Sequence, residues 1–163
     1  MKVLLVRHAI AVDRDTPGIS DHLRPLTEEG AARFKKSVRA LADMVTVDSV
    51  LTSPLLRAKQ TAEILVRGFP GLTLHEAEPL GSGSRTEFEA TLARLPKNGT
   101  VAAVGHEPSV SEWTAEWLGS ANPEAFAFKK GGFALIEFDA RVEKGAGRLV
   151  FFLAPKVLKA LSE

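Results

Sequence analysis

The sequence predicts an α/β protein, a three-layer α/β/α sandwich whose central sheet is mostly parallel and has an antiparallel edge. Three short apolar runs bounded by turn residues are typical of buried parallel strands, and they lie near residues 2–6, 48–52 and 101–104. Segments with helical spacing of apolar residues separate these runs, as in folds that alternate strands and helices. Near the carboxyl end, runs at 133–138 and 149–153 flank a glycine-containing turn and predict an antiparallel pair.

The first helix is expected to begin after Thr27. A threonine at this position caps free backbone N–H groups, and Glu28 and Glu29 follow in the first turn, where the helix dipole favours carboxylates. The apolar side chains of this helix recur at helical spacing and form one face for the core, made of Phe34, Val38, Leu41, Ala42 and Val45.

Capping and turn residues also mark the bounds of the remaining elements. Ser53 is expected to cap the second helix, with Pro54 at its first position. A short strand is expected near 72–75, a flexible loop at 81–84 and a helix over about 85–95. Pro108 is expected to open a further helix, in which Trp113 and Trp117 stand at core spacing.

Composition excludes several classes of function. The chain has 163 residues, which suggests one domain over 1–163, and its net charge of +1 provides no overall field that would favour nucleic acid or an anionic membrane. The absence of cysteine excludes disulfides, thiolate metal sites and thiol catalysis. The first apolar run is too short for a signal peptide and no window suits a membrane span, so we expect a cytoplasmic protein. The sequence leaves open whether it is a monomer or a dimer, and the strand at 133–138 is expected to offer an exposed edge that could pair.

Chemically distinctive residues follow each of the three parallel strands. Arg7 and His8 come after the first, Ser53 and Arg57 after the second, and His106 after the third. In an open α/β sheet, ligands bind just beyond the carboxyl ends of the strands. We therefore expect two histidines and two arginines to meet in one crevice.

These residue types suit phosphate chemistry. Imidazole is a nucleophile at neutral pH, because its ordinary pKa is about 6.5 and much of it is unprotonated. A guanidinium binds phosphate oxygens through paired hydrogen bonds, and Arg57 stands near a helix amino terminus, where anions bind.

Other motifs predict no further ligand. Gly81-x-Gly83 lacks the third glycine of a dinucleotide-binding turn. His22 and His75 have no motif around them, so we expect each either at the surface or behind the residues that contact the substrate. No metal-binding spacing is present, and we predict neither a metal nor another cofactor.

The three motifs together resemble the signature of the histidine phosphatase superfamily, which includes the cofactor-dependent phosphoglycerate mutases. The signature consists of a strand followed by Arg-His, then Ser-Pro-x-x-Arg-Ala-x-x-Thr from Ser53, then Gly-His at His106. The short chain, the Arg-Pro-Leu-Thr-x-x-Gly segment from Arg24 and the Val-Gly-His-Glu-Pro run look most like the SixA-type phosphohistidine phosphatases. The resemblance covers nearly the whole chain and implies a phosphoglycerate mutase-like fold.

The resemblance implies a two-step, metal-independent phosphoryl transfer. His8 would attack phosphorus and form a phosphohistidine, which water would then hydrolyse, while Arg7, Arg57 and His106 would surround the phosphate oxygens. Arg24 and Ser53 are further candidates for substrate binding.

Two positions depart from the family pattern. Ala9 stands where relatives usually have glycine after the histidine. Many relatives also have a glutamate that acts as general acid between the second and third motifs. In this interval the chain has four glutamates, none in a distinctive motif: Glu76, Glu78, Glu87 and Glu89. Glu78 is the candidate among them, and surface exposure is the ordinary alternative for each.

The missing acid favours phosphohistidine as the substrate. An alkoxide leaving group needs a proton, whereas imidazole can be protonated near neutral pH. We therefore expect a phosphorylated protein partner, such as a phosphotransfer domain in signal transduction. The alternatives are a small-molecule phosphomonoesterase acting on a sugar phosphate, nucleotide or polyphosphate, a mutase, and a non-catalytic phosphate-binding module.

Overall fold

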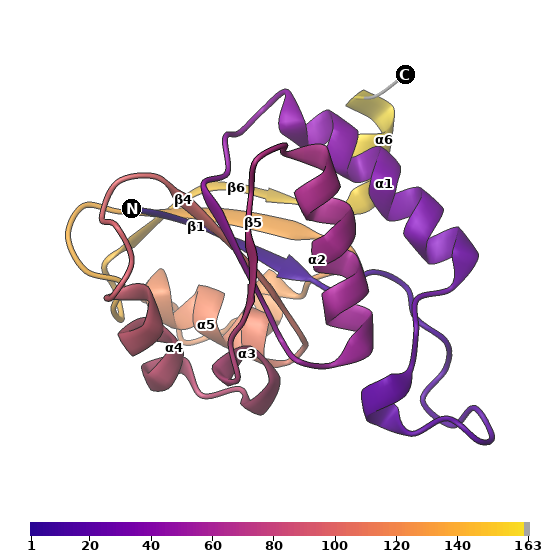
Figure 1. Ribbon diagram of the computed structural model, residues 1–163. Coiled ribbons are helices and arrows are strands. Elements are labelled where there is room, and N and C mark those ends of the chain that lie inside the picture. Colours follow the sequence, from indigo (N-terminus) through magenta and orange to yellow (C-terminus); the bar gives the residue numbers. More distant parts are fainter. Residues whose placement is uncertain (162–163) are drawn as a thin grey trace.

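A six-stranded sheet lies between two layers of helices in the computed structural model, which describes residues 1–161 (Figure 1). The strand order is β3-β2-β4-β1-β5-β6. Helices α1, α2 and α6 cover one face, and α3, α4 and α5 cover the other. The predicted α/β sandwich with a mostly parallel sheet is therefore confirmed.

The strands and helices have the following bounds. The strands are β1 (Lys2–Arg7), β2 (Ser49–Thr52), β3 (Leu74–Glu76), β4 (Thr100–Gly105), β5 (Phe133–Phe138) and β6 (Gly147–Leu153). The α-helices are α1 (Glu28–Ala42), α2 (Leu56–Gly68), α3 (Pro79–Ser82), α4 (Arg85–Leu92), α5 (Ser109–Trp117) and α6 (Pro155–Leu161). Two short 3-10 helices lie at Asp21–Leu23 and Pro123–Phe126.

Strand β1 runs through the centre of the sheet. It pairs in parallel with β4 and antiparallel with β5, and its residues from Val3 to Val6 are fully buried. A strand covered on both faces needs a continuous apolar run, which explains why β1 and β4 lack the alternation of a half-exposed strand. Because β1 and β2 both pair in parallel with β4, the carboxyl ends of the three strands lie at one edge of the sheet.

The edge of the sheet differs from the expectation. The strand at 133–138 was expected to offer an exposed edge, but β5 lies between β1 and β6, and β6 forms the edge. The residues of β5 are almost all buried, whereas Leu149 and Val150 on β6 are exposed. The more apolar strand of the hairpin occupies the inner position because both of its faces are covered there.

Helix α1 begins as predicted. The Thr27 hydroxyl accepts a hydrogen bond from the Gly30 backbone N–H at 2.9 Å and so caps the helix. Gly30 lies against the chain that leaves β1, and a Cβ atom added there would stand 2.2 Å from the Ile10 carbonyl oxygen. Glycine is therefore required for this helix to pack against the segment that follows His8.

Two local predictions were wrong, and one helix was not predicted. Helix α2 begins at Leu56, with Leu55 as its N-cap residue, so neither Ser53 nor Pro54 starts it. Residues 81–84 are not a flexible loop, because Pro79–Ser82 forms the short helix α3 and Gly83 ends it with φ of +82°. Helix α6 was not predicted, and it buries Leu158 in the core beside α1. Short helices carry too few turns for their periodicity to be recognised.

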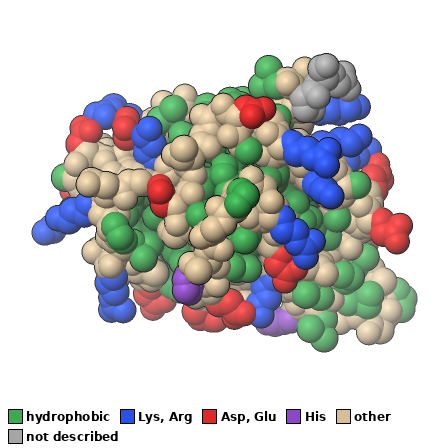
Figure 2. Space-filling view, turned by 45° about the horizontal axis from the view of Figure 1, so that its top comes forward, with side chains coloured by type: hydrophobic (Ala, Val, Ile, Leu, Met, Phe, Trp, Pro, Cys, Tyr) green, Lys and Arg blue, Asp and Glu red, His purple; other side chains and the backbone are tan. Residues whose placement is uncertain are grey.

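The hydrophobic core between the sheet and helices α3, α4 and α5 contains the two tryptophans that were expected in a core. Trp113 and Trp117 are buried, and the Trp113 ring stacks on Phe88 with centroids 5.1 Å apart. On the molecular face in Figure 2, basic and acidic side chains are interspersed with apolar ones, in agreement with the small net charge.

The close approach at Gly30 leads to a stability prediction. Gly30→Ala should destabilise the fold by about 1–3 kcal/mol, because the added methyl group meets the Ile10 carbonyl. At an uncrowded helix position, the same change gains up to about 1 kcal/mol. Urea unfolding followed by circular dichroism measures the difference, and Ala32→Gly at an exposed position of α1 is the control for helix propensity. A gain in stability from Gly30→Ala would contradict the packing argument.

Candidate active site

The parallel pairing of β1 with β4 brings the two motif histidines together. Arg7 stands opposite Gly105 in the register, and the His8 backbone N–H donates to the Gly105 carbonyl at 3.0 Å. The ring centroids of His8 and His106 are therefore only 5.1 Å apart. The expected convergence at the strand ends is present in the structure.

The His8 ring is held in one tautomer. Its Nδ1 lies 2.7 Å from the carbonyl oxygen of Ala9, and because a carbonyl only accepts, Nδ1 must carry the proton. The lone pair is then on Nε2. Burial lowers the pKa of His8 to about 3, against a weaker opposing effect from the Ala9 hydrogen bond, so the ring is neutral at pH 7.

Ala9 fits at the position where relatives usually have glycine. Among the described residues, no residue other than glycine has a positive φ, so the backbone at Ala9 suits an ordinary side chain. The Ala9 N–H donates to the Thr61 hydroxyl at 3.0 Å, and that hydroxyl donates to the Arg57 carbonyl at 2.6 Å. This chain of bonds ties the segment after His8 to helix α2.

Ser53 contacts His106 instead of capping a helix. Its hydroxyl is buried, lies 2.8 Å from His106 Nε2 and accepts from the Leu55 N–H at 3.3 Å. Burial is the main cause that lowers the pKa of His106 to about 4, and the positive charge of Arg57 acts in the same direction. Ser53 thus fixes the orientation of a second neutral imidazole.

Arg57 extends from the first turn of α2 toward the same region, and only 4% of the residue is exposed. One Nη donates to the Asp21 backbone carbonyl at 2.8 Å, and the other lies 3.4 Å from the Asp21 carboxylate. Burial lowers the pKa of Arg57, but an arginine with an ordinary value above 12 keeps its charge at neutral pH.

Asp21 is a site residue that the sequence reasoning missed. It lies in the 3-10 helix Asp21–Leu23 and joins Arg57 to Arg24, whose Nε donates to its carboxylate at 2.9 Å. Burial alone would raise the pKa of Asp21, but the Arg24 hydrogen bond and the charge of Arg57 together lower it. The carboxylate is therefore ionised. In the sequence, only its position three residues before Arg24 could have indicated Asp21.

Arg24 itself is buried, and it reaches the site through Asp21. Its Nη1 donates to the Val12 carbonyl at 2.8 Å, so two groups of the loop already bind this guanidinium. Its charge still contributes to the lowered pKa values of Arg57 and His106.

Arg7 is positioned by Phe128 and Glu107, which were not among the expected site residues. Its Nη1 donates to the Phe128 carbonyl at 2.6 Å, and the Phe128 N–H donates to the Glu107 carboxylate at 2.9 Å. That carboxylate also accepts from the Ser111 hydroxyl at 2.6 Å. Glu107 belongs to the Val-Gly-His-Glu-Pro run, but that motif gave it no role of its own.

Three buried side-chain nitrogens have no hydrogen-bond partner within the described chain: Arg7 Nε, Arg57 Nε and His106 Nδ1. Buried polar groups are almost always paired, and exceptions call for an explanation. Two of these nitrogens belong to guanidinium groups, which bind anions through charge-assisted hydrogen bonds. The arrangement is suited to an oxyanion placed beside His8.

The glutamates considered as acids do not join this group. Glu78 is exposed at the start of α3, and within residues 1–161 it forms no hydrogen bond or ion pair with Arg7, His8, Arg57 or His106. Glu76 pairs with Lys59, and Glu87 is exposed. Glu89 is only partly exposed, because it binds Arg85 and accepts from Trp117 Nε1 at 2.8 Å.

Two other kinds of site are absent from residues 1–161. No three His, Asp or Glu side chains come together as a metal-binding group. No helix in this range has the length and apolar character needed to span a bilayer.

Comparison with known proteins identifies the family. A model of the histidine phosphatase superfamily (branch 1) matches residues 3–81. The chain is also 30% identical to the phosphohistidine phosphatase SixA of Escherichia coli strain K12, across 98% of this chain and 97% of that protein. The chain belongs to the histidine phosphatase superfamily. Within it the chain is SixA-type, and the protein is a phosphatase.

Solved structures agree with this membership in the superfamily. The protein histidine phosphatase SixA complexed with tungstate has a TM-score of 0.82 and 28% identity, covering 98% of this chain and all of the other. A SixA homologue from Agrobacterium tumefaciens has a TM-score of 0.78 and 28% identity over 94% of this chain and 97% of its own. An Escherichia coli protein described as an alpha-ribazole-5'-P phosphatase has a TM-score of 0.76 at 20% identity, covers 95% of this chain and 98% of its own, and shares the fold.

The lowered pKa values make a prediction about pH. His8 and His106 should remain unprotonated down to about pH 5, whereas a free histidine titrates near pH 6.5. The unfolded chain then binds more protons than the folded one between pH 6.5 and the lowered values, so the free energy of unfolding should fall as the pH drops below 6.5. NMR titration measures each ring, with His8→Asn and His106→Asn assigning the signals. A titration midpoint near pH 6.5 for either ring would contradict the lowering of its pKa by burial.

Proposed function

We propose that this phosphatase hydrolyses phosphohistidine on a protein through a phosphohistidine intermediate at His8. The observation that carries the proposal is the combination of a neutral His8 with its lone pair on Nε2 and three unpartnered buried nitrogens around the strand ends. The first provides a nucleophile, and the others suit the oxygens of the phosphoryl group. The similarity to SixA proteins supports the same conclusion.

The reaction has two displacements. In the first, Nε2 of His8 attacks phosphorus, the bond from phosphorus to the substrate imidazole breaks, and that imidazole takes a proton from water. In the second, a water oxygen attacks phosphorus and the bond to His8 breaks. The proton that this water releases neutralises the hydroxide left by the first step, and hydrogen phosphate leaves with His8 restored. The sum consumes one water for each phosphohistidine.

Each residue of the site has a distinct part in this scheme. Arg7 and Arg57 bind the phosphoryl oxygens, and His106 completes the pocket while Ser53 orients its ring. Because Phe128 and Asp21 already hold the two guanidinium groups, little reorganisation is needed as charge develops. Preorganised donors of this kind contribute about 3–4 kcal/mol each. Arg24 supports Arg57 through Asp21.

The acid chemistry of the site favours an imidazole leaving group. Asp21 is ionised by its arginine partners, and Glu107 accepts hydrogen bonds from Ser111 and Phe128. Neither carboxylate is placed to donate a proton to an alkoxide. General acid help is worth about 10²–10⁴-fold, so its absence penalises phosphomonoesters more than phosphohistidine.

The nucleophile can be tested by trapping the intermediate. Wild type mixed with radiolabelled phosphohistidine protein and quenched in base should retain label, because phosphohistidine is stable to base. His8→Ala should retain none and lose turnover, whereas His22→Ala, at an exposed histidine, should behave as wild type. Labelling of the His8→Ala variant would overturn the assignment.

Substrate preference separates the two candidate activities. The phosphatase should hydrolyse phosphohistidine protein with a kcat/KM at least tenfold above that for sugar phosphates, nucleotides or polyphosphate. The rates should be unchanged in EDTA. Preference for any phosphomonoester would instead support a small-molecule phosphatase, an activity named for the alpha-ribazole-5'-P neighbour that shares the fold.

A further inference from the structure

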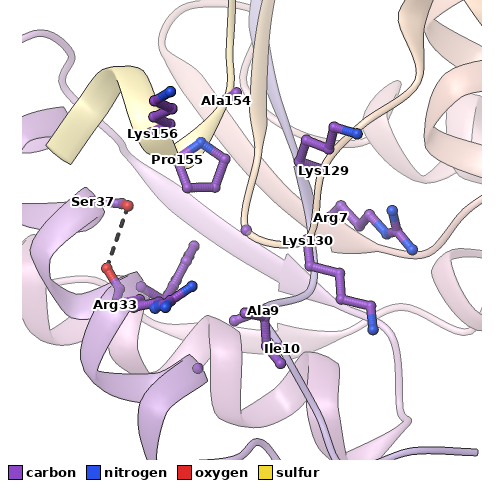
Figure 3. A pocket seen from close by; sticks show the side chains of 13 residues that line it. Arg7, Ala9, Ile10, Arg33, Ser37, Lys129, Lys130, Ala154, Pro155 and Lys156 are labelled. Atoms are coloured by element: carbon purple, nitrogen blue, oxygen red, sulfur yellow. Dashed lines mark hydrogen bonds between the residues drawn. The ribbon is translucent and has the colours of Figure 1, made fainter. Parts of the chain in front are cut away.

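A pocket of about 480 Å³ opens beside the proposed phosphate site (Figure 3). It lies between the end of β1, helix α1, the loop 129–131 and the start of α6. Apolar groups form much of its lining, including Ile10, Phe34 and Pro155. Its charged lining residues are all basic, because no Asp or Glu within residues 1–161 lines it: Arg7, Arg33, Lys129, Lys130 and Lys156.

The pocket lies next to the proposed phosphate site. Arg7 belongs to both, and Figure 3 shows Lys129 and Lys130 on the same side of the pocket as Arg7. The Gly131 N–H donates to the carbonyls of Arg7 and His8, each at 3.1 Å. The loop that carries the two lysines is therefore fastened to the backbone that presents the nucleophile.

The positive charge of this pocket is only partly compensated. Arg33 pairs with Glu29 one turn earlier on α1. The exposed ammonium groups of Lys129, Lys130 and Lys156 form no ion pair with a carboxylate of residues 1–161. With a net charge of +1 for the whole chain, this gathering of cations is a local feature.

We propose that the pocket binds an acidic segment of the protein substrate, next to its phosphorylated histidine. The inference rests on the proposed function and extends it to substrate recognition. An apolar floor with a charged, solvent-exposed rim is the composition of a protein interface. Small-molecule sites instead place a few buried polar groups toward the ligand, and here the buried Ser37 hydroxyl donates back to the Arg33 carbonyl of its own helix.

The charge pattern also sets the chemistry of the segment. Carboxylates flanking the phosphohistidine would face the lysines, and an apolar side chain between them would contact the floor near Phe34. Rim charges act mainly by steering association and selecting partners, so their effect should appear in kcat/KM and should weaken with salt.

Two peptides and two variants test this proposal. Each peptide carries one histidine, phosphorylated with phosphoramidate, and the flanks are Asp and Glu in one and Asn and Gln in the other. The test variant is Lys129→Glu with Lys156→Glu; Lys130, whose side chain extends beside Arg7 in Figure 3, is unchanged. The matched control variant carries the charge reversals Lys97→Glu and Lys144→Glu. Lys97 precedes β4 and Lys144 lies in the β5–β6 turn, so both stand at the opposite end of the sheet. Phosphoimidazole is the small probe.

The expected result is a selective loss. Wild type should prefer the acidic peptide roughly tenfold in kcat/KM at low salt, and the test variant should lose this preference. The kcat/KM of the test variant for phosphoimidazole should stay within about threefold of wild type. The kcat/KM of the control variant for the acidic peptide should stay within the same range.

Other outcomes overturn the proposal in distinguishable ways. Equal kcat/KM for both peptides in wild type, or an unchanged preference in the test variant, would exclude the pocket as the recognition site. An equal loss on phosphoimidazole would assign the lysines to the phosphate site itself. Wild type that hydrolyses phosphomonoesters but neither peptide would refute the proposed function, and the docking proposal with it.

Discussion

The parallel pairing of β1 with β4 is the constraint on which the site depends. Its register sets Arg7 opposite Gly105, so the next residues of the two strands, His8 and His106, lie side by side. The apolar residues of both strands are buried between two helical layers, and this burial stabilises the pairing. A slip of one residue would turn the buried side chains to the opposite faces and separate the histidines.

Holding these polar groups in a buried site requires compensation elsewhere. Backbone carbonyls provide most of it: Ala9 binds His8, Phe128 binds Arg7, and Asp21 binds Arg57. Burial also keeps both imidazoles neutral, which leaves His8 with a free lone pair at neutral pH. The fold thus maintains two guanidinium charges and two uncharged imidazoles within one small region.

Much of the fold and site could be predicted from local patterns. The apolar runs indicated the strands that bear His8 and His106, and Thr27 marked the start of α1. The same patterns failed where several structures fit one local sequence. Ser53 and Pro54 resemble a helix start, yet α2 begins at Leu56 and the Ser53 hydroxyl lies against His106. The edge position of β6 depends on how the last hairpin docks.

The sequence by itself determined the α/β class, the order of the main elements and the motif residues that mark the candidate site, because strand burial and motif spacing are local properties. Only the tertiary structure decided that Asp21 joins Arg24 to Arg57, that Glu107 positions Arg7 through Phe128, and that basic residues from three separate elements border one pocket. These relations link residues far apart in the chain, and several pass through backbone carbonyls that every residue type shares. Local residue patterns do not specify these contacts, which form only when the sheet and its helices are assembled.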